Sequence, residues 1–169
     1  MDTTRLEIRT EATIWMLRGA FMGIAAGGVF LIFEMGVAGL TDQSAFEPLR
    51  MIAAVVLGEA ALHMERTVDL ATVVPVALAV HYTLSAIYGA VFGTITAEIG
   101  ALRKSRLALI GAATMFGLLL WLVNFYLIAP LAFPWFSMAD PLAQFAAHTV
   151  FFGTVLGLLL ARRLEGKGK

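Results

Sequence analysis

The sequence predicts an all-α membrane protein whose four transmembrane helices form a bundle. Sixty per cent of its 169 residues are hydrophobic and 14% are charged, with a mean hydropathy of +0.85. Soluble domains contain roughly 45 to 50% apolar and about 25% charged residues. A helix that crosses a bilayer needs about 20 mostly apolar residues, and the chain has room for four. We therefore expect residues 1–169 to be one transmembrane domain.

The four spans can be placed between charged residues and prolines. The first contains only Arg18 near its start and Glu34 near its end, and Pro130 and Pro134 should end the third near residue 129. The predicted spans are about 14–40, 70–97, 107–129 and 141–161.

Residues 44–63 are more ambiguous than the spans. Their apolar run from Met51 to Gly58 lies between Arg50 and Glu59 and is only eight residues long. We predict an interfacial helix, or a re-entrant helix that dips into one membrane face, with a fifth span as the alternative.

The distribution of Lys and Arg predicts the orientation. Ten lie on the side of the two termini and the 98–106 loop, and only Arg50 and Arg66 lie on the other. This asymmetry predicts that both termini are cytoplasmic.

Four polar residues interrupt the predicted spans at comparable depth, in the outer half of the membrane. They are Glu34, His81, Asn124 and His148. Because polar groups are costly in lipid, they usually face the bundle interior and have partners there. We expect one intramembrane polar cluster.

The two halves of the sequence share a spacing pattern. Gly27 and Phe46 recur 90 positions later as Gly117 and Phe136, and at the same offset the polar Glu34 corresponds to the polar Asn124. The two histidines are 67 positions apart, which would place about 23 extra residues in the first half. The pattern is compatible with a tandem repeat of a two-helix unit, and with chance similarity between apolar helices.

Small residues recur along three of the spans and predict helix packing surfaces. Such residues let helix backbones approach closely in lipid. The contacts could lie within the bundle or with another subunit. The candidates are Gly19, Gly23, Gly27, Gly89, Gly93, Gly153 and Gly157.

Several alternatives stay open for the polar residues. His81 and His148 could ligate haem b or a metal, or could be structural hydrogen-bonding groups with Ser85 and Gln144 as local partners. Glu34 should be protonated or paired with an imidazolium, so it could relay protons or lock helices together.

Two further sites lie on the predicted outer side. Glu59 and His63 have a metal-compatible helical spacing but form a weak metal candidate. Trp135 and Phe136, in a loop with two prolines and three aromatic residues, should lie in the interfacial belt or form an outer docking surface.

The run WLVNFYLIAPLAFPWF at 121–136, together with HTVFFG at 148–153, resembles an uncharacterised family of small four-span bacterial inner-membrane proteins. The resemblance covers mainly the third and fourth spans, and implies a multi-pass protein of the bacterial cytoplasmic membrane but no activity.

Composition and motifs narrow the function further. A formal net charge of zero gives no electrostatic footprint for nucleic acid, and the chain has no cysteine. It shows no phosphate-binding glycine loop or nucleophile elbow.

We predict a non-enzymatic accessory or assembly subunit of a membrane complex. The first partner to test is a respiratory or other energy-transducing complex, and contact with a second copy is the other possibility. No cofactor is expected. The alternative is a haem-binding, metal-binding or proton-relay protein.

Overall fold

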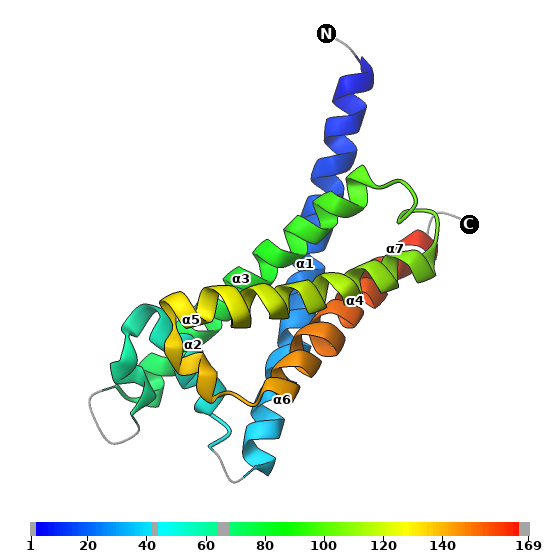
Figure 1. Ribbon diagram of the computed structural model, residues 1–169. Coiled ribbons are helices and arrows are strands. Elements are labelled where there is room, and N and C mark those ends of the chain that lie inside the picture. The colour runs from blue at the N-terminus through cyan, green and yellow to red at the C-terminus, as the bar shows by residue number, and fades with distance from the viewer. Residues whose placement is uncertain (1–2, 42–43, 64–67, 166–169) are drawn as a thin grey trace.

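The computed structural model describes residues 3–41, 44–63 and 68–165, and within these ranges it contains helices and loops but no strand (Figure 1). Four helices are long and apolar enough to cross a membrane: Thr10–Leu40, Leu70–Glu98, Arg106–Ala132 and Pro141–Arg162. The predicted fold class is therefore confirmed, and the chain is a multi-pass membrane protein. Of the residues used above to predict orientation, Arg66, Lys167 and Lys169 lie outside the described residues.

The helical elements follow the predicted spans closely. The first half contains α1 (Thr3–Leu40), α2 (Glu47–Leu57), the short 3-10 helix η1 (Glu59–Leu62) and α3 (Leu70–Glu98). The second half contains α4 (Arg106–Val123), η2 (Asn124–Ile128), α5 (Ala129–Ala132), η3 (Pro134–Met138), α6 (Pro141–Ala146), η4 (Ala147–Thr154) and α7 (Val155–Glu165). The third span is the continuous series α4–η2–α5, and the fourth is α6–η4–α7.

Polar side chains cap the start of three spans. The first backbone N–H groups of a helix have no partner within the helix, and a short oxygen-bearing side chain can accept from one of them. The acceptor–donor pairs are Asp69 with the Thr72 N–H at 2.9 Å, Ser105 with Ala108 at 3.2 Å, and Asp140 with Ala143 at 2.7 Å.

The third span differs from the prediction at its end. Pro130 was expected to stop the helix near residue 129, but the helix continues to Ala132 and breaks at Phe133, before Pro134. The preceding turns form the π-helix η2, whose wider i→i+5 geometry changes the backbone positions that a proline ring normally meets in an α-helix. Pro130 is therefore accommodated within the span.

The segment 44–63 forms a short helix followed by a turn of 3-10 helix, and it is not among the four candidate spans. Helix α2 packs on α3 and buries Leu49, Arg50 and Met51. The buried Arg50 guanidinium donates through Nη1 to the Ala61 carbonyl at 3.1 Å, which fixes η1 against α2. This segment therefore packs against the first pair of spans, mainly on α3.

Glycines bring the spans together in two close pairs. In the first pair, the backbones of α1 and α3 touch: a Cβ placed on Gly19 would lie 2.1 Å from the Gly89 oxygen, and one on Gly23 would lie 2.3 Å from the Ser85 oxygen. Gly27 faces the Ser85 and His81 side chains, and Gly93 meets the backbone of Trp15. These glycines make contacts within the bundle.

The second pair joins the third and fourth spans. A Cβ on Gly117 would lie 2.2 Å from the His148 oxygen, and one on Gly153 would lie 2.6 Å from the Ala113 oxygen. Gly157 meets Ile110 in the same way. Each pair consists of consecutive spans, which is the arrangement that a repeated two-helix unit would have.

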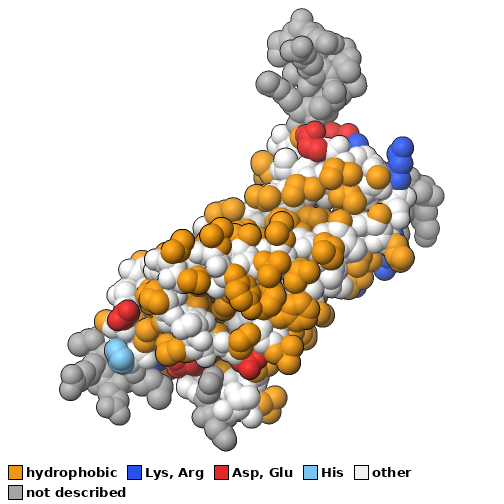
Figure 2. All heavy atoms as spheres, viewed as in Figure 1, with side chains coloured by type: hydrophobic (Ala, Val, Ile, Leu, Met, Phe, Trp, Pro, Cys, Tyr) orange, Lys and Arg blue, Asp and Glu red, His pale blue; other side chains and the backbone are white. Residues whose placement is uncertain are grey.

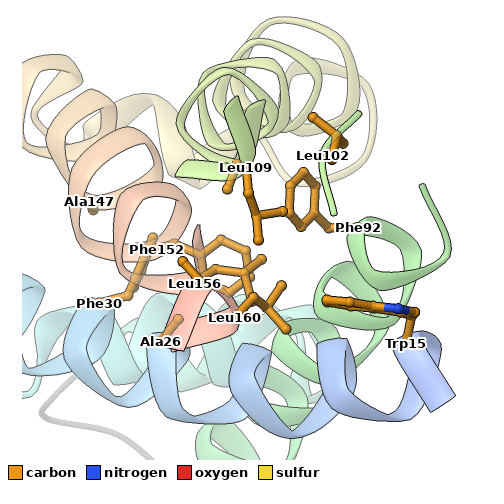
Figure 3. Close-up of a cluster of buried hydrophobic side chains, with 12 residues drawn as sticks. Trp15, Ala26, Phe30, Phe92, Leu102, Leu109, Ala147, Phe152, Leu156 and Leu160 are labelled. Carbon is orange, nitrogen blue, oxygen red and sulfur yellow. The ribbon is translucent and has the colours of Figure 1, made fainter. Parts of the chain in front are cut away.

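Apolar side chains fill much of the space between the two pairs. One buried cluster includes Phe30 of α1, Phe92 of α3, Leu109 of α4, and Phe152 and Leu156 of the fourth span (Figure 3). A second cluster, which includes Leu31 and Ala77, lies under α2. In the space-filling view, hydrophobic side chains cover the middle of the molecule and the visible charged groups gather near its ends (Figure 2). This pattern suits a protein surrounded by lipid.

Candidate functional site

A cavity of about 390 Å³ lies between the two helix pairs. Glu34, His81, Asn124 and His148 all line it, so the structure brings the four predicted intramembrane polar residues to one site. Most of the other lining is apolar and comes from every span and from α2, including Phe30, Met51, Leu84, Leu120, Phe125, Ala129, Phe136 and Phe152. An apolar pocket of this size with a few convergent polar groups is typical of ligand sites.

His81 is held by the glycine face of α1. Its Nε2 lies 2.8 Å from the Gly27 carbonyl oxygen. Because a carbonyl only accepts hydrogen bonds, Nε2 must carry the proton, and a neutral ring then presents Nδ1 as an acceptor. The neighbouring Ser85 hydroxyl donates to the His81 backbone carbonyl at 2.7 Å. The small size of Gly27 is what allows this approach.

His148 is fixed by its own helix. Its Nδ1 lies 2.9 Å from the Gln144 carbonyl oxygen, one turn earlier, so Nδ1 carries the proton by the same argument. The ring is buried, and its Nε2 makes no hydrogen bond within the described part of the chain. A neutral His148 therefore offers an unused acceptor at the cavity.

Glu34 has one partner and one free oxygen. Gln144 donates from Nε2 to Glu34 Oε2 at 2.7 Å, which joins α1 to α6. The other carboxyl oxygen, Oε1, is buried and has no hydrogen-bond partner in the described residues. An unsatisfied buried oxygen costs about 1 to 3 kcal/mol, so Glu34 is held at this position at an energetic cost.

Asn124 links the two helix pairs through a hydrogen bond with Tyr88, which was not among the predicted site residues. The Tyr88 hydroxyl of α3 donates to Asn124 Oδ1 of η2 at 3.1 Å. Tyr88 lies seven residues after His81, almost two helical turns, and so lies on the same face of α3. The seven-residue spacing from His81 could therefore have predicted from the sequence that Tyr88 belongs to the site. Gln144, considered only as a local partner of His148, proves to contact Glu34 as well.

Phe30 was also missed, and it bears directly on haem binding. Its ring lies against both imidazoles, with centroid distances of 5.3 Å to His81 and 4.9 Å to His148. His81 Nε2 is already bonded to Gly27. This arrangement does not fit a haem iron held between the two histidines, because the phenyl ring and the Gly27 bond would both have to be displaced.

Two π-helical segments contribute to the cavity wall. Segment η2 supplies Asn124, Phe125 and Ile128, and η4 supplies His148 and Phe152. Well under 1% of residues in proteins are π-helical, and such segments occur frequently at functional sites. Here the wider turns lie where the third and fourth spans face the cavity.

Helices α3 and α4 bound the cavity loosely on one side. These two helices make few backbone contacts with each other, and Leu84 of α3, which lines the cavity, is 42% exposed. Pro48 and Met51 of α2, with Phe133 and Phe136, line the cavity as well.

Trp135 and Phe136, in the loop between the third and fourth spans, make contacts within the protein. Trp135 donates from Nε1 to the Met51 carbonyl at 3.1 Å, and Phe136 packs edge-on against Phe125, 6.0 Å between centroids. Both side chains are half-buried. They hold η3 against α2 and η2, and so offer less surface for docking than the sequence indicated.

Glu59 and His63 are not held on one helical face. The 3-10 helix η1 ends at Leu62, and His63 has an extended backbone, so the predicted α-helical spacing is absent. Among the described residues, no group of three or more His, Asp or Glu side chains gathers as a metal site.

Comparisons with family models, curated proteins and solved structures find no match to this chain. The resemblance of residues 121–136 and 148–153 to a family of small four-span proteins therefore stays a prediction.

Proposed function

We propose that this chain is a small, non-enzymatic membrane protein that holds a lipid-soluble molecule in the cavity between its two helix pairs. The cavity itself carries the proposal: about 390 Å³, mostly apolar, and lined by Glu34, His81, Asn124 and His148. Its walls come from membrane spans, and its loosely bounded side faces lipid, so the bilayer is the natural source of the ligand.

The cavity chemistry supports binding over catalysis. Nucleophilic catalysis needs a hydroxyl bonded to a base. Ser85 is the hydroxyl beside an imidazole, but it donates to the backbone carbonyl of His81 and so is not paired with the ring. Glu34 is bonded to the uncharged amide of Gln144.

The test is to identify what the cavity holds. The protein is purified from its native membrane in mild detergent and extracted with organic solvent, and the extract is quantified by mass spectrometry. We expect about one lipid-soluble molecule per chain, enriched over bulk lipid. Ala129→Phe should fill the cavity and reduce that yield, whereas Ala79→Phe, on an exposed part of α3 outside the lining, should not. Wild-type protein without any enriched molecule would overturn the proposal.

We further propose that the protein works as an accessory component of a larger complex in the bacterial cytoplasmic membrane, with both termini cytoplasmic. We expect a neighbouring subunit at the exposed apolar side chains where the third span ends and the fourth begins, such as Leu131 at 82% and Leu142 at 73%. A photocrosslinking residue at 131 should capture a defined membrane protein, and one at the buried Ala113 should not. Equal, non-selective labelling from both positions would argue against an accessory role.

A further inference from the structure

Two imidazole nitrogens of residues that line the cavity are unused hydrogen-bond acceptors. The carbonyls of Gly27 and Gln144 fix the protons of the two imidazoles on His81 Nε2 and His148 Nδ1. Neutral rings then leave His81 Nδ1 and His148 Nε2 as acceptors without partners in the described chain. A molecule that uses these sites must bring a hydrogen-bond donor.

We propose that the cavity binds the hydroxyl-bearing head of an uncharged, lipid-soluble molecule, whose hydroxyl donates to His148 Nε2 while its apolar tail leaves between α3 and α4. This inference rests on the proposed function and names the ligand class for the same site. A hydroxyl also accepts hydrogen bonds, so the side-chain amide of Asn124 can donate to it.

The lining excludes several other head groups. It includes no Lys or Arg, so a phosphate or carboxylate head would have no cation to pair with. A head with only carbonyl or ether oxygens could not donate to an imidazole nitrogen. The chemistry therefore favours an alcohol or a phenol over an anionic lipid.

The cavity has room for more than the head of such a molecule. An apolar cavity of about 150 Å³ can hold benzene, so 390 Å³ accommodates a one-ring or glycerol head together with part of its tail. The rest of a long apolar tail would lie outside, beside Leu84. Two sources share this chemistry, a quinol and a monoacylglycerol, and the experiment distinguishes them.

The test measures binding of defined probes to the full chain in phosphatidylcholine nanodiscs by calorimetry. The probes are a decyl-substituted hydroquinone, its dimethyl ether, a monoacylglycerol of similar chain length, and decylamine. We expect saturable one-to-one binding of the hydroquinone or the monoacylglycerol, with the tighter one identifying the source. The dimethyl ether, which has lost both donors, should bind at least fivefold more weakly than the hydroquinone, because unmade hydrogen bonds at buried groups cost about 1 to 3 kcal/mol.

Two substitutions of the same residue locate the acceptor. In His148→Asn, the amide nitrogen can replace Nδ1 as donor to Gln144, but nothing replaces Nε2, so affinity for the tighter probe should fall about fivefold or more. In His148→Gln, the longer side chain can place its amide oxygen near the Nε2 position, so affinity should recover in part. His63→Asn, at an exposed histidine outside the cavity, is the matched control and should bind like wild type.

Each result bears on a specific claim. If the ether binds as tightly as the hydroquinone, or if His148→Asn binds like wild type, the hydroxyl inference is wrong. If decylamine binds more tightly than the hydroquinone, and Glu34→Gln abolishes that preference, the hydroxyl inference is also wrong. The ligand is then a cation paired with the Glu34 carboxylate. In both cases a stoichiometric molecule extracted from the wild-type protein would keep the proposed function. The probe comparison uses the wild-type chain, so it decides the inference even if a variant fails to accumulate.

Discussion

Substitution of Gly19 by alanine should separate the first pair of spans. The added Cβ would lie 2.1 Å from the Gly89 oxygen, whereas ordinary contact begins at 3.4 Å, so the two backbones must move apart by 3.4 − 2.1 = 1.3 Å there. Over-packing of this kind costs about 1 to 3 kcal/mol. Alanine recovers up to about 1 kcal/mol as the better helix former. We expect a net loss of about 1 to 2 kcal/mol in the free energy of unfolding.

Gly36 in the same helix is the matched control. A Cβ at this position meets nothing within 4 Å, so Gly36→Ala should leave stability unchanged or raise it by up to about 1 kcal/mol. Both free energies can be measured by SDS titration in mixed micelles, followed by circular dichroism. If the two variants differ by less than about 0.5 kcal/mol, the backbone contact between α1 and α3 does not have the geometry described.

Three further predictions use other parts of the molecule. A cysteine at Ser137 should react with a membrane-impermeant maleimide in intact cells and one at Lys104 should not; labelling at Lys104 alone would reverse the orientation. Glu34→Gln should preserve accumulation, because an amide can still bond to Gln144, whereas Glu34→Lys should reduce it. Full tolerance of lysine would mean that this side chain can leave the bundle interior. Trp135→Phe removes the hydrogen bond to the Met51 carbonyl and should lower the free energy of unfolding by about 0.5 to 1.5 kcal/mol, which a lower melting temperature would reveal. An unchanged melting temperature would show that this bond does not stabilise the protein.

The spans were predictable because lipid imposes a simple requirement on sequence. A segment that crosses the bilayer must be long and apolar, so charged residues and caps such as Asp69 and Asp140 mark the ends directly. The end of the third span was placed wrongly because the rule for proline assumes an ordinary α-helix. The preceding sequence does not reveal that η2 widens its turns.

The cavity was predictable only in part. Depth along each span placed Glu34, His81, Asn124 and His148 at one level, because depth follows from counting residues. Rotation about each helix axis is set by close packing at glycines, so the contact of Phe30 with both histidines could not be derived. The contact between Tyr88 and Asn124 depends in addition on how the two helix pairs meet.

The glycine contacts also have a consequence for how the protein is made. Each closely packed pair is a hairpin of consecutive spans, and the connection at 99–105 is the link between them. The ribosome completes the first hairpin before the second, so the first can insert and close by itself. The cavity exists only after the second hairpin joins it, so a molecule seated there binds the assembled bundle and favours that last step by mass action. Two fragments divided within 99–105 and co-expressed should therefore recombine, and any molecule that binds the cavity should make the recombination more complete.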